Sequence, residues 1–254
     1  MSDRHTRGTV VAVRLAGCIV TLLSALAAGA GALDPQELLA RADATRAEVG
    51  EGIAHIRVIN VRDGKASAPQ DLDLYLGQGD RALCVFRGGQ QHDRKILSVG
   101  GRVWLIVPGA SRPVPLSANQ RLLGGAMLAD LTRARLAEMF TATMRPDEES
   151  VDGTACAVLD LAAVSAKAAY RSGVLWVATE DRLPRRLRLA LADGRPAREL
   201  SYLAYGSEQG RPRLTRLEVR DLVAHGGRRS TVLEFLGFER ARLDPALFEP
   251  PAVR

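Results

Sequence analysis

The stretch Lys95-Ile-Leu-Ser-Val-Gly-Gly-Arg-Val-Trp-Leu-Ile-Val107 indicates the fold class of the chain. Two apolar runs, rich in β-branched and aromatic residues, flank the pair Gly100-Gly101. A glycine pair can adopt the positive φ angles that a tight hairpin turn requires. The sequence therefore predicts two antiparallel strands, 95–99 and 102–107, which are joined at the glycines and end at Pro108-Gly109.

Similar strand signals occur on both sides of this hairpin. Residues 70–76 alternate between leucine and other side chains, which places Leu72, Leu74 and Leu76 on one face. Turn residues recur at intervals of about ten residues, as an antiparallel meander requires. Further strands are expected at 81–86, 156–161, 173–178, 186–191, 200–205, 214–223 and 230–238.

A helix is expected before the first strand. Asp34 can cap its N-terminus, Pro35 suits the first helical position, and Glu37 can reach back to the cap. Gly50 and Gly52 then stop the helix. Its apolar stripe consists of Leu38, Leu39 and Ala42. This segment is predicted to be an amphipathic helix that packs on the sheet.

The middle of the chain changes from strand to helical spacing. Residues 120–143 have apolar side chains at helical intervals, with a break at Gly124-Gly125. We expect one or two short helices here, inserted between strands, which either cover an apolar cavity or belong to an ordinary core. The apolar positions are Leu122, Leu123, Met127, Leu128, Leu131, Leu136, Met139 and Phe140.

The first 32 residues have the layout of an export signal. Three arginines precede an apolar run, 15–26, and Ala30-Gly31-Ala32 fits a cleavage site after Ala32. We therefore expect a signal peptide at 1–32, one domain at 33–254 and a periplasmic location. Leu15-Ala-Gly-Cys18 also spells a lipoprotein cleavage box, so a lipid anchor at Cys18 is an alternative, as is an uncleaved membrane helix.

Composition excludes several function classes. Residues 1–32 contribute +2 of the formal net charge of +6, and the remaining charges are interspersed, which does not favour nucleic-acid binding. Neither a metal-ligand spacing nor a nucleophile–base arrangement is present, so no metal, no cofactor and no catalytic residue is predicted. The stretch Gly77-Gln-Gly79-Asp-Arg-Ala82 resembles a dinucleotide fingerprint, but a strand follows it where a helix is needed.

Two cysteines remain after the predicted cleavage, Cys84 and Cys156. Export to an oxidising compartment permits a disulfide between them. Both also lie in apolar strand-like stretches, where a small buried thiol is equally ordinary. The spacing alone leaves both alternatives open, because it does not show whether the two strands meet.

Several motifs together resemble the LolA-like family of outer-membrane lipoprotein-sorting proteins. They are 95–109, then Arg121 with 124–131, then 174–184 with Asp193-Gly194, 200–202 and Asp244-Pro-Ala-Leu-Phe248. Their order covers nearly all of the chain after residue 32. The resemblance departs at Ile106, where many relatives have tyrosine, and in the stretch 87–94, where relatives often have a proline.

The resemblance implies an α+β fold, an incomplete antiparallel β-barrel of about ten to eleven strands whose open side is covered by N-terminal and central helices. It implies a non-catalytic, monomeric periplasmic carrier of lipid or lipoprotein acyl chains, with an inner-membrane exporter and an outer-membrane acceptor as further partners. The residues expected to line the cavity and its lid are Trp104, Ile106, Leu123, Met127, Leu128 and Leu131.

Two other functions remain open at this point. A protein of the same shape can act as a periplasmic sensor or adaptor that works with a membrane lipid exporter or a signalling partner. A cell-envelope hydrolase is the third alternative, since catalytic partners can be distant in sequence.

Overall fold

The structure is a computed structural model, and it describes residues 34–47, 50–110, 112–116, 136–208, 210–223 and 227–249. Asp34–Arg254 forms one compact unit. The central positions 120–135, where helical spacing was recognised, lie outside the described residues, as does the expected signal peptide. Within the described residues, no helix is both long enough and apolar enough to cross a membrane.

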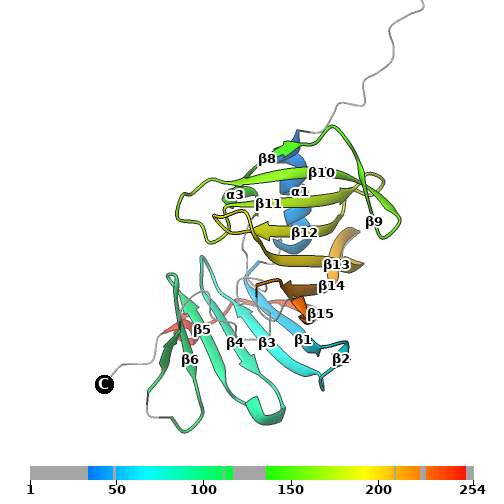
Figure 1. Cartoon of the computed structure of the whole chain (residues 1–254). Coiled ribbons are helices and arrows are strands. Elements are labelled where there is room, and N and C mark those ends of the chain that lie inside the picture. Colours follow the sequence, from blue (N-terminus) through cyan, green and yellow to red (C-terminus); the bar gives the residue numbers. More distant parts are fainter. Residues whose placement is uncertain are drawn as a thin grey trace, which may run out of the picture. The chain divides into compact units, whose positions relative to one another are not determined.

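The described part of the chain forms a large antiparallel sheet (Figure 1). The sheet has 15 strands, more than the ten to eleven expected from the sequence. Its main path runs β7-β6-β5-β4-β3-β1-β15-β14-β13-β12-β11-β10-β8, while β2 pairs with β1 and β9 pairs with β10. Because β7 and β8 at the two ends are not paired with each other, the sheet is unclosed, as predicted.

The elements have the following bounds. The first half of the sheet contains β1 (Gly52–Arg62), β2 (Lys65–Ala66), β3 (Gln70–Leu76), β4 (Ala82–Phe86), β5 (Lys95–Val99), β6 (Arg102–Ile106) and β7 (Val114–Leu116). The second half contains β8 (Phe140–Met144), β9 (Glu149–Val151), β10 (Thr154–Ala163), β11 (Ser172–Ala178), β12 (Pro184–Ala190), β13 (Pro196–Glu208), β14 (Arg211–Asp221) and β15 (Arg229–Arg240). The helices are α1 (Pro35–Ala47), α3 (Leu136–Met139) and the 3-10 turns η1 (Gly89–Gln91) and η3 (Pro245–Phe248).

The five strands that sequence analysis missed are β1, β2, β7, β8 and β9. The prediction of helix up to residue 143 was wrong at its end, because α3 stops at Met139 and β8 begins at Phe140. Pairing decides this boundary: Ala142 lies opposite Leu161 of β10, a partner that helical spacing cannot reveal. The other strands form where alternation predicted them, and the glycine pair 100–101 has positive φ angles between β5 and β6.

Helix α1 lies where the capping signals placed it. The Asp34 carboxylate accepts a hydrogen bond from the backbone N–H of Gln36 at 3.4 Å. Glu37 does not reach back to the cap; it pairs with Arg41 one turn later, at 2.6 Å. Leu38, Leu39 and Ala42 are at most 3% exposed, and the helix contacts β8, β14 and α3. The predicted apolar stripe therefore packs on the second half of the sheet.

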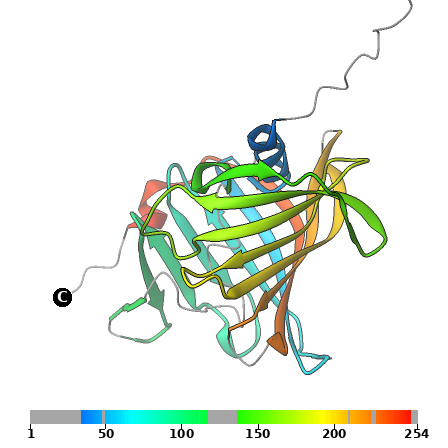
Figure 2. The same cartoon turned by 45° about the horizontal axis from the view of Figure 1, so that its top comes forward.

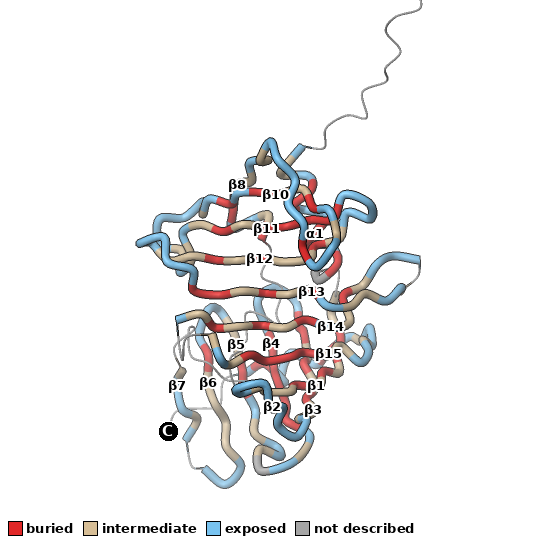
Figure 3. The backbone as a smooth tube through the Cα atoms, turned by 45° about the vertical axis from the view of Figure 1, so that its right-hand side comes forward, coloured by how far each residue is buried: buried red, intermediate tan, exposed pale blue. Residues whose placement is uncertain are grey.

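The sheet bends along its length (Figure 2). Buried positions are spread through its strands, while many of the turns that join them are exposed (Figure 3). Burial alternates along β1 and β3, as expected for strands whose two faces have different environments. The two faces of the sheet therefore have different surroundings.

Candidate functional site: the aliphatic face of the sheet

One face of the first half of the sheet is lined by small and aliphatic side chains. Directly paired residues of neighbouring antiparallel strands point to the same face. Cross-strand pairing connects a single row over β6, β5, β4, β3 and β1. The row consists of Leu105, Ile96, Cys84, Leu74 and Ala54. We call the face that carries this row the aliphatic face.

The aliphatic face continues across the second half of the sheet. A second row passes from β8 through β10, β11, β12, β13, β14 and β15 to β1. Its members are Met144, Leu159, Leu175, Leu187, Leu200, Val219, Thr231 and Asn60. The five aliphatic residues from Leu159 to Val219 are at most 2% exposed. Apolar side chains therefore extend over one face from β8 to β6.

Two charged residues interrupt this surface. Arg198 is 2% exposed and Asp221 is 7% exposed, and they are directly paired across β13 and β14. Arg198 lies two residues before Leu200 in β13, and Asp221 lies two residues after Val219 in β14. Since side chains two residues apart in a strand point to the same face, both charges lie on the aliphatic face. Sequence reasoning missed them, although a charge at an inward position of an alternating strand was a usable signal. Buried charges of this kind need partners, because leaving water is costly.

Trp104 and Ile106 lie on the same face of the sheet, as predicted, but this face is the one opposite the aliphatic face. Trp104 lies across from Leu97, which lies across from Leu83. Both predicted residues pack against a cluster that the C-terminal segment completes. The cluster contains Leu83, Val85, Leu97, Leu243 and Phe248. The structure thus gives Trp104 and Ile106 a packing role, and contact with a ligand stays a prediction.

The other predicted ligand-binding residues, Leu123, Met127, Leu128 and Leu131, lie outside the described residues. The structure therefore does not bring them together with Trp104 and Ile106. What it adds to the predicted site is Leu105, which stands between those two in sequence and belongs to the aliphatic face. Leu105 is only partly buried, so its side chain remains accessible there.

Cys84 and Cys156 are free, buried thiols rather than a disulfide. They lie in β4 and β10, strands that are far apart in the order of the sheet. Cys84 belongs to the aliphatic face, opposite Leu74, and burial raises the pKa of its thiol to about 12. Cys156 packs with Val158 and Trp176 on the other face. Both cysteines therefore act as small apolar residues.

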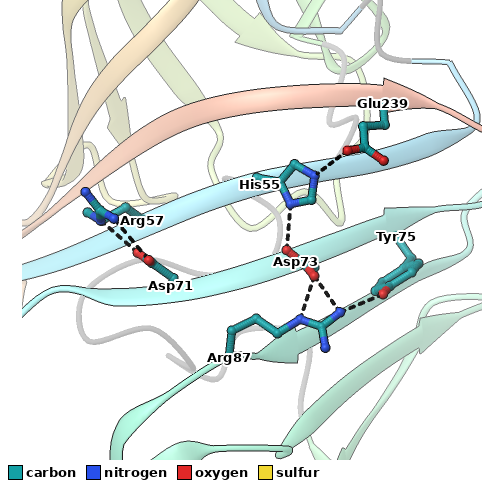
Figure 4. A network of polar contacts seen from close by, with 7 residues as sticks. All are labelled: His55, Arg57, Asp71, Asp73, Tyr75, Arg87 and Glu239. Carbon is teal, nitrogen blue, oxygen red and sulfur yellow. Dashed lines mark hydrogen bonds and ion pairs between the residues drawn. The ribbon is translucent and has the colours of Figure 1, made fainter.

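The opposite face, which we call the mixed face, carries a polar network between its apolar clusters (Figure 4). His55 Nδ1 lies 2.7 Å from Asp73 Oδ1, and His55 Nε2 lies 3.3 Å from Glu239 Oε1. Arg87 donates to the second oxygen of Asp73 at 2.5 Å and to the Tyr75 hydroxyl at 2.8 Å. The network links β1, β3, β15 and the residue after β4.

The hydrogen bonds around His55 link neighbouring strands of the sheet to one another. The hydrogen bond to Asp73, followed by the one to Glu239, raises the pKa of His55, because both carboxylates favour the protonated ring. Both oxygens of Asp73 are engaged, one by His55 and one by Arg87. The network contains no serine, threonine or cysteine that His55 could activate as a nucleophile. Among the described residues, no group of three potential metal ligands is found.

Comparisons with known proteins agree with this architecture. A family model described as "Uncharacterized protein" matches residues 78–254. Among curated proteins, none matches the chain significantly. A LolA superfamily protein from Nitrosomonas europaea is similar in structure, with 22% identity over 86% of this chain and 98% of that one, at a TM-score of 0.71.

Two further solved structures have the same architecture. A DUF1329 family protein from Desulfovibrio piger has 20% identity, over 85% of this chain and 98% of that one, at a TM-score of 0.68. A domain described as an outer membrane lipoprotein-sorting protein, from Vibrio parahaemolyticus, has 18% identity over 84% and 95%, at a TM-score of 0.66. The chain therefore belongs to the family of the matching model, and its fold is the LolA-like fold that the sequence motifs resemble.

Proposed function

We propose that the protein is a non-catalytic periplasmic carrier that binds lipid or lipoprotein acyl chains on the aliphatic face. The observation that carries the proposal is the set of apolar side chains that extends over one face from β8 to β6, interrupted by the pair Arg198 and Asp221, on an unclosed sheet. Apolar side chains of this kind are stable when they are covered, and helix α1 contacts β8 and β14. An acyl chain has the chemistry to pack against such side chains, among which Leu105 is only partly buried.

The energetics of acyl-chain burial are sufficient for such a carrier. Burial of one methylene contributes about 0.8 kcal/mol, so a chain of about twelve methylenes contributes roughly 10 kcal/mol before the costs of association. Since the interaction is not directional, many acyl chains can bind to the same face. Specificity for a cargo would then come from contacts with its headgroup or protein part.

The lid of this carrier is assigned to the central segment. Leu123, Met127, Leu128 and Leu131 have the helical spacing that would present an apolar face to the sheet. Trp104 and Ile106 stay predicted ligand contacts, but they lie on the mixed face, so on the aliphatic face the proposed contact from this strand is Leu105. Replacing Leu128 or Leu131 with aspartate would weaken lipid uptake while leaving the sheet folded.

Export and delivery complete the proposal. Residues 1–32 act as a signal peptide that is removed after Ala32, and the monomeric domain 33–254 carries cargo towards the outer membrane. An inner-membrane exporter would supply the cargo and an outer-membrane acceptor would receive it. The similarity in fold to a domain described as lipoprotein-sorting supports a role in lipoprotein transport, and the direction of that transport is part of the proposal.

A sensor or adaptor of the same fold is the second candidate. The hydrogen bonds of His55 and the packed apolar clusters order the side chains of the mixed face, to which a partner protein could bind. The carrier predicts lipid that purifies with the protein, whereas the adaptor predicts a stable protein partner and little lipid. A hydrolase would require one indispensable nucleophile or base.

The deciding experiment is purification of the full chain from the periplasm of a Gram-negative host without detergent, followed by intact mass spectrometry and lipid extraction. We expect a chain that starts at Leu33 and a stoichiometric amount of lipid. A matched pair of variants localises the lipid: Leu105→Gln changes the aliphatic face, and Leu203→Gln makes the same change at a side chain that is 49% exposed.

Leu105→Gln should reduce the extracted lipid several-fold, because a buried amide without partners opposes the acyl chain. Leu203→Gln should leave the lipid unchanged, and circular dichroism should show that both variants are folded. Lipid-free wild-type protein, or equal lipid in the two variants, would count against the carrier.

A further inference from the structure

A separate pocket lies on the mixed face, where the turn between β3 and β4 meets the C-terminal segment. Its volume is about 280 Å³. The side chains that line it are Glu51, Gln78, Arg81, Arg242, Leu243, Pro245 and Phe248. Leu243 and Phe248 are also members of the cluster that packs against Trp104, so the pocket adjoins a buried apolar cluster.

The walls of the pocket are fixed by specific contacts. One oxygen of Glu51 accepts a hydrogen bond from the backbone N–H of Leu243 at 2.8 Å, and the other accepts from the Gln78 side chain at 3.2 Å. The backbone oxygen of Glu51 accepts from Ala241 N at 3.3 Å. The start of β1, the β3–β4 turn and the C-terminal segment are thereby held together around the cavity.

The charges of the pocket do not cancel. Both oxygens of Glu51, the acidic residue of the lining, are engaged by Leu243 and Gln78. Within the described residues, neither Arg81 nor Arg242 takes part in an ion pair. Arg81 and Arg242 therefore line the same small pocket as Glu51. Because the donors to Glu51 are neutral groups, its negative charge remains, and the two arginines leave the lining with a net positive charge. Guanidinium groups present donors that match the oxygens of phosphate and carboxylate.

Part of the lining of the pocket is apolar. It is formed by Leu243, Pro245 and Phe248, of which Leu243 and Phe248 are at most 8% exposed. A cavity of about 280 Å³ holds a charged headgroup and a few methylenes, but not a long acyl chain. The lining combines two arginines that form no ion pair within the described residues with an apolar part, and this suits a molecule with one anionic end and one apolar end.

We propose that this pocket binds the anionic headgroup, a phosphate or a carboxylate, of a small amphiphile. Arg81 and Arg242 bind its oxygens, and its first methylenes lie against Leu243, Pro245 and Phe248. The amphiphile is either a free monomer or a component of a membrane surface, since both present the same chemistry. The pocket is on the opposite face from the acyl-chain site, so the inference does not depend on the proposed carrier function.

The test measures binding of dihexanoylphosphatidic acid, a short anionic amphiphile that stays monomeric, by isothermal titration calorimetry with the full chain. Inorganic phosphate and dihexanoylglycerol are the probes for the charge alone and the apolar part alone. Vesicles of phosphatidylcholine, with and without an equal part of phosphatidic acid, test the membrane source. The variants are Arg81→Gln/Arg242→Gln and, as a charge-matched control at two distant exposed positions, Arg62→Gln/Lys167→Gln.

Removal of both arginines should weaken binding of the phosphatidic acid by at least about tenfold, because hydrogen bonds to charged groups are lost. The control variant should bind as wild type, and each single-part probe should bind more weakly than the amphiphile. Binding to the monomer alone identifies a free amphiphile, and binding to the anionic vesicles as well identifies a membrane surface.

Three results would overturn the inference. The first is equal affinity of the arginine variant and the control. The second is inorganic phosphate binding as tightly as the amphiphile, which would leave the apolar wall without a role. The third is loss of phosphatidic acid binding in Leu105→Gln together with normal binding in the arginine variant. This result would show that the phosphatidic acid binds to the aliphatic face, and it would support the carrier instead.

Discussion

The side chain of Gln36 pairs with the backbone of Ala142 as a neighbouring strand would. Gln36 Oε1 accepts a hydrogen bond from Ala142 N at 3.0 Å, while its Nε2 donates to the oxygens of Phe140 at 3.1 Å and Ala137 at 3.0 Å. Strand β8 is one end of the sheet, so these backbone groups have no strand to pair with on that side. One amide of α1 therefore satisfies the exposed edge and links the helix to it.

Replacement of Gln36 with alanine should lower the free energy of unfolding by about 1–3 kcal/mol, since it leaves partly buried backbone groups without partners. Urea denaturation measures the effect. Glu37→Ala on the same helix is the control, because it removes an exposed pair with Arg41 and should cost about 0.5 kcal/mol or less. Equal losses in the two variants would mean that the Gln36 contacts add nothing beyond an ordinary surface pair.

The His55 network should make stability depend on pH. Because Asp73 and Glu239 raise the pKa of His55 in the folded protein above its ordinary value of 6.5, the folded state binds the proton more tightly than the unfolded state. The stabilisation is fully present below 6.5 and is lost as the pH rises through the folded pKa. The free energy of unfolding relative to His55→Asn should therefore be larger at about pH 5.5 than at about pH 8.5.

If the difference in the free energy of unfolding between wild type and His55→Asn is the same at both pH values, the carboxylates do not favour the protonated ring of His55.

The turn between β3 and β4 should not tolerate a side chain at Gly77. A Cβ atom there would lie 2.8 Å from two ring carbons of Phe248, whose position is fixed in the C-terminal cluster. Gly77→Ala should lower the free energy of unfolding by about 1–3 kcal/mol through overpacking. The denaturation midpoint measures this directly.

Gly88→Ala is the matched control for Gly77. A Cβ atom at Gly88 meets nothing within 4 Å, and the φ angle of −176° is one that alanine adopts freely. This variant should be as stable as wild type. A Gly77→Ala protein as stable as wild type would show that the C-terminal segment shifts easily. The walls of the pocket lined by Arg81, Arg242 and Phe248 would then not be fixed.

Cys84 should be chemically inert in the folded protein. Burial raises the pKa of its thiol to about 12, so almost none of it is thiolate near neutral pH. Alkylation with iodoacetamide, followed by peptide mapping, should find Cys84 and Cys156 unmodified in native protein and both modified in urea. Labelling of Cys84 in native protein would reveal opening of the sheet between β3 and β5. A disulfide found by mass spectrometry of the unreduced protein would contradict the free thiols.

Much of the sheet could be read from alternation, because a strand with one buried face repeats every two residues. Leu72, Leu74 and Leu76 were placed correctly for this reason. β1 was missed since it carries apolar residues on both faces: Ile53 lies on the mixed face and Ile56 on the aliphatic face. The strand at 140–144 was missed because Phe140 also continued a helical pattern.

The sequence by itself determined which side chains of a strand share a face, as it did for Trp104 and Ile106, and it determined where α1 begins. Only the tertiary structure decided which of two apolar faces meets the C-terminal segment, and that Arg81 and Arg242 border one pocket. The reason is physical. Periodicity is a property of the local backbone, whereas the partner of a face is chosen by segments more than a hundred residues away, such as Phe248 against Leu97.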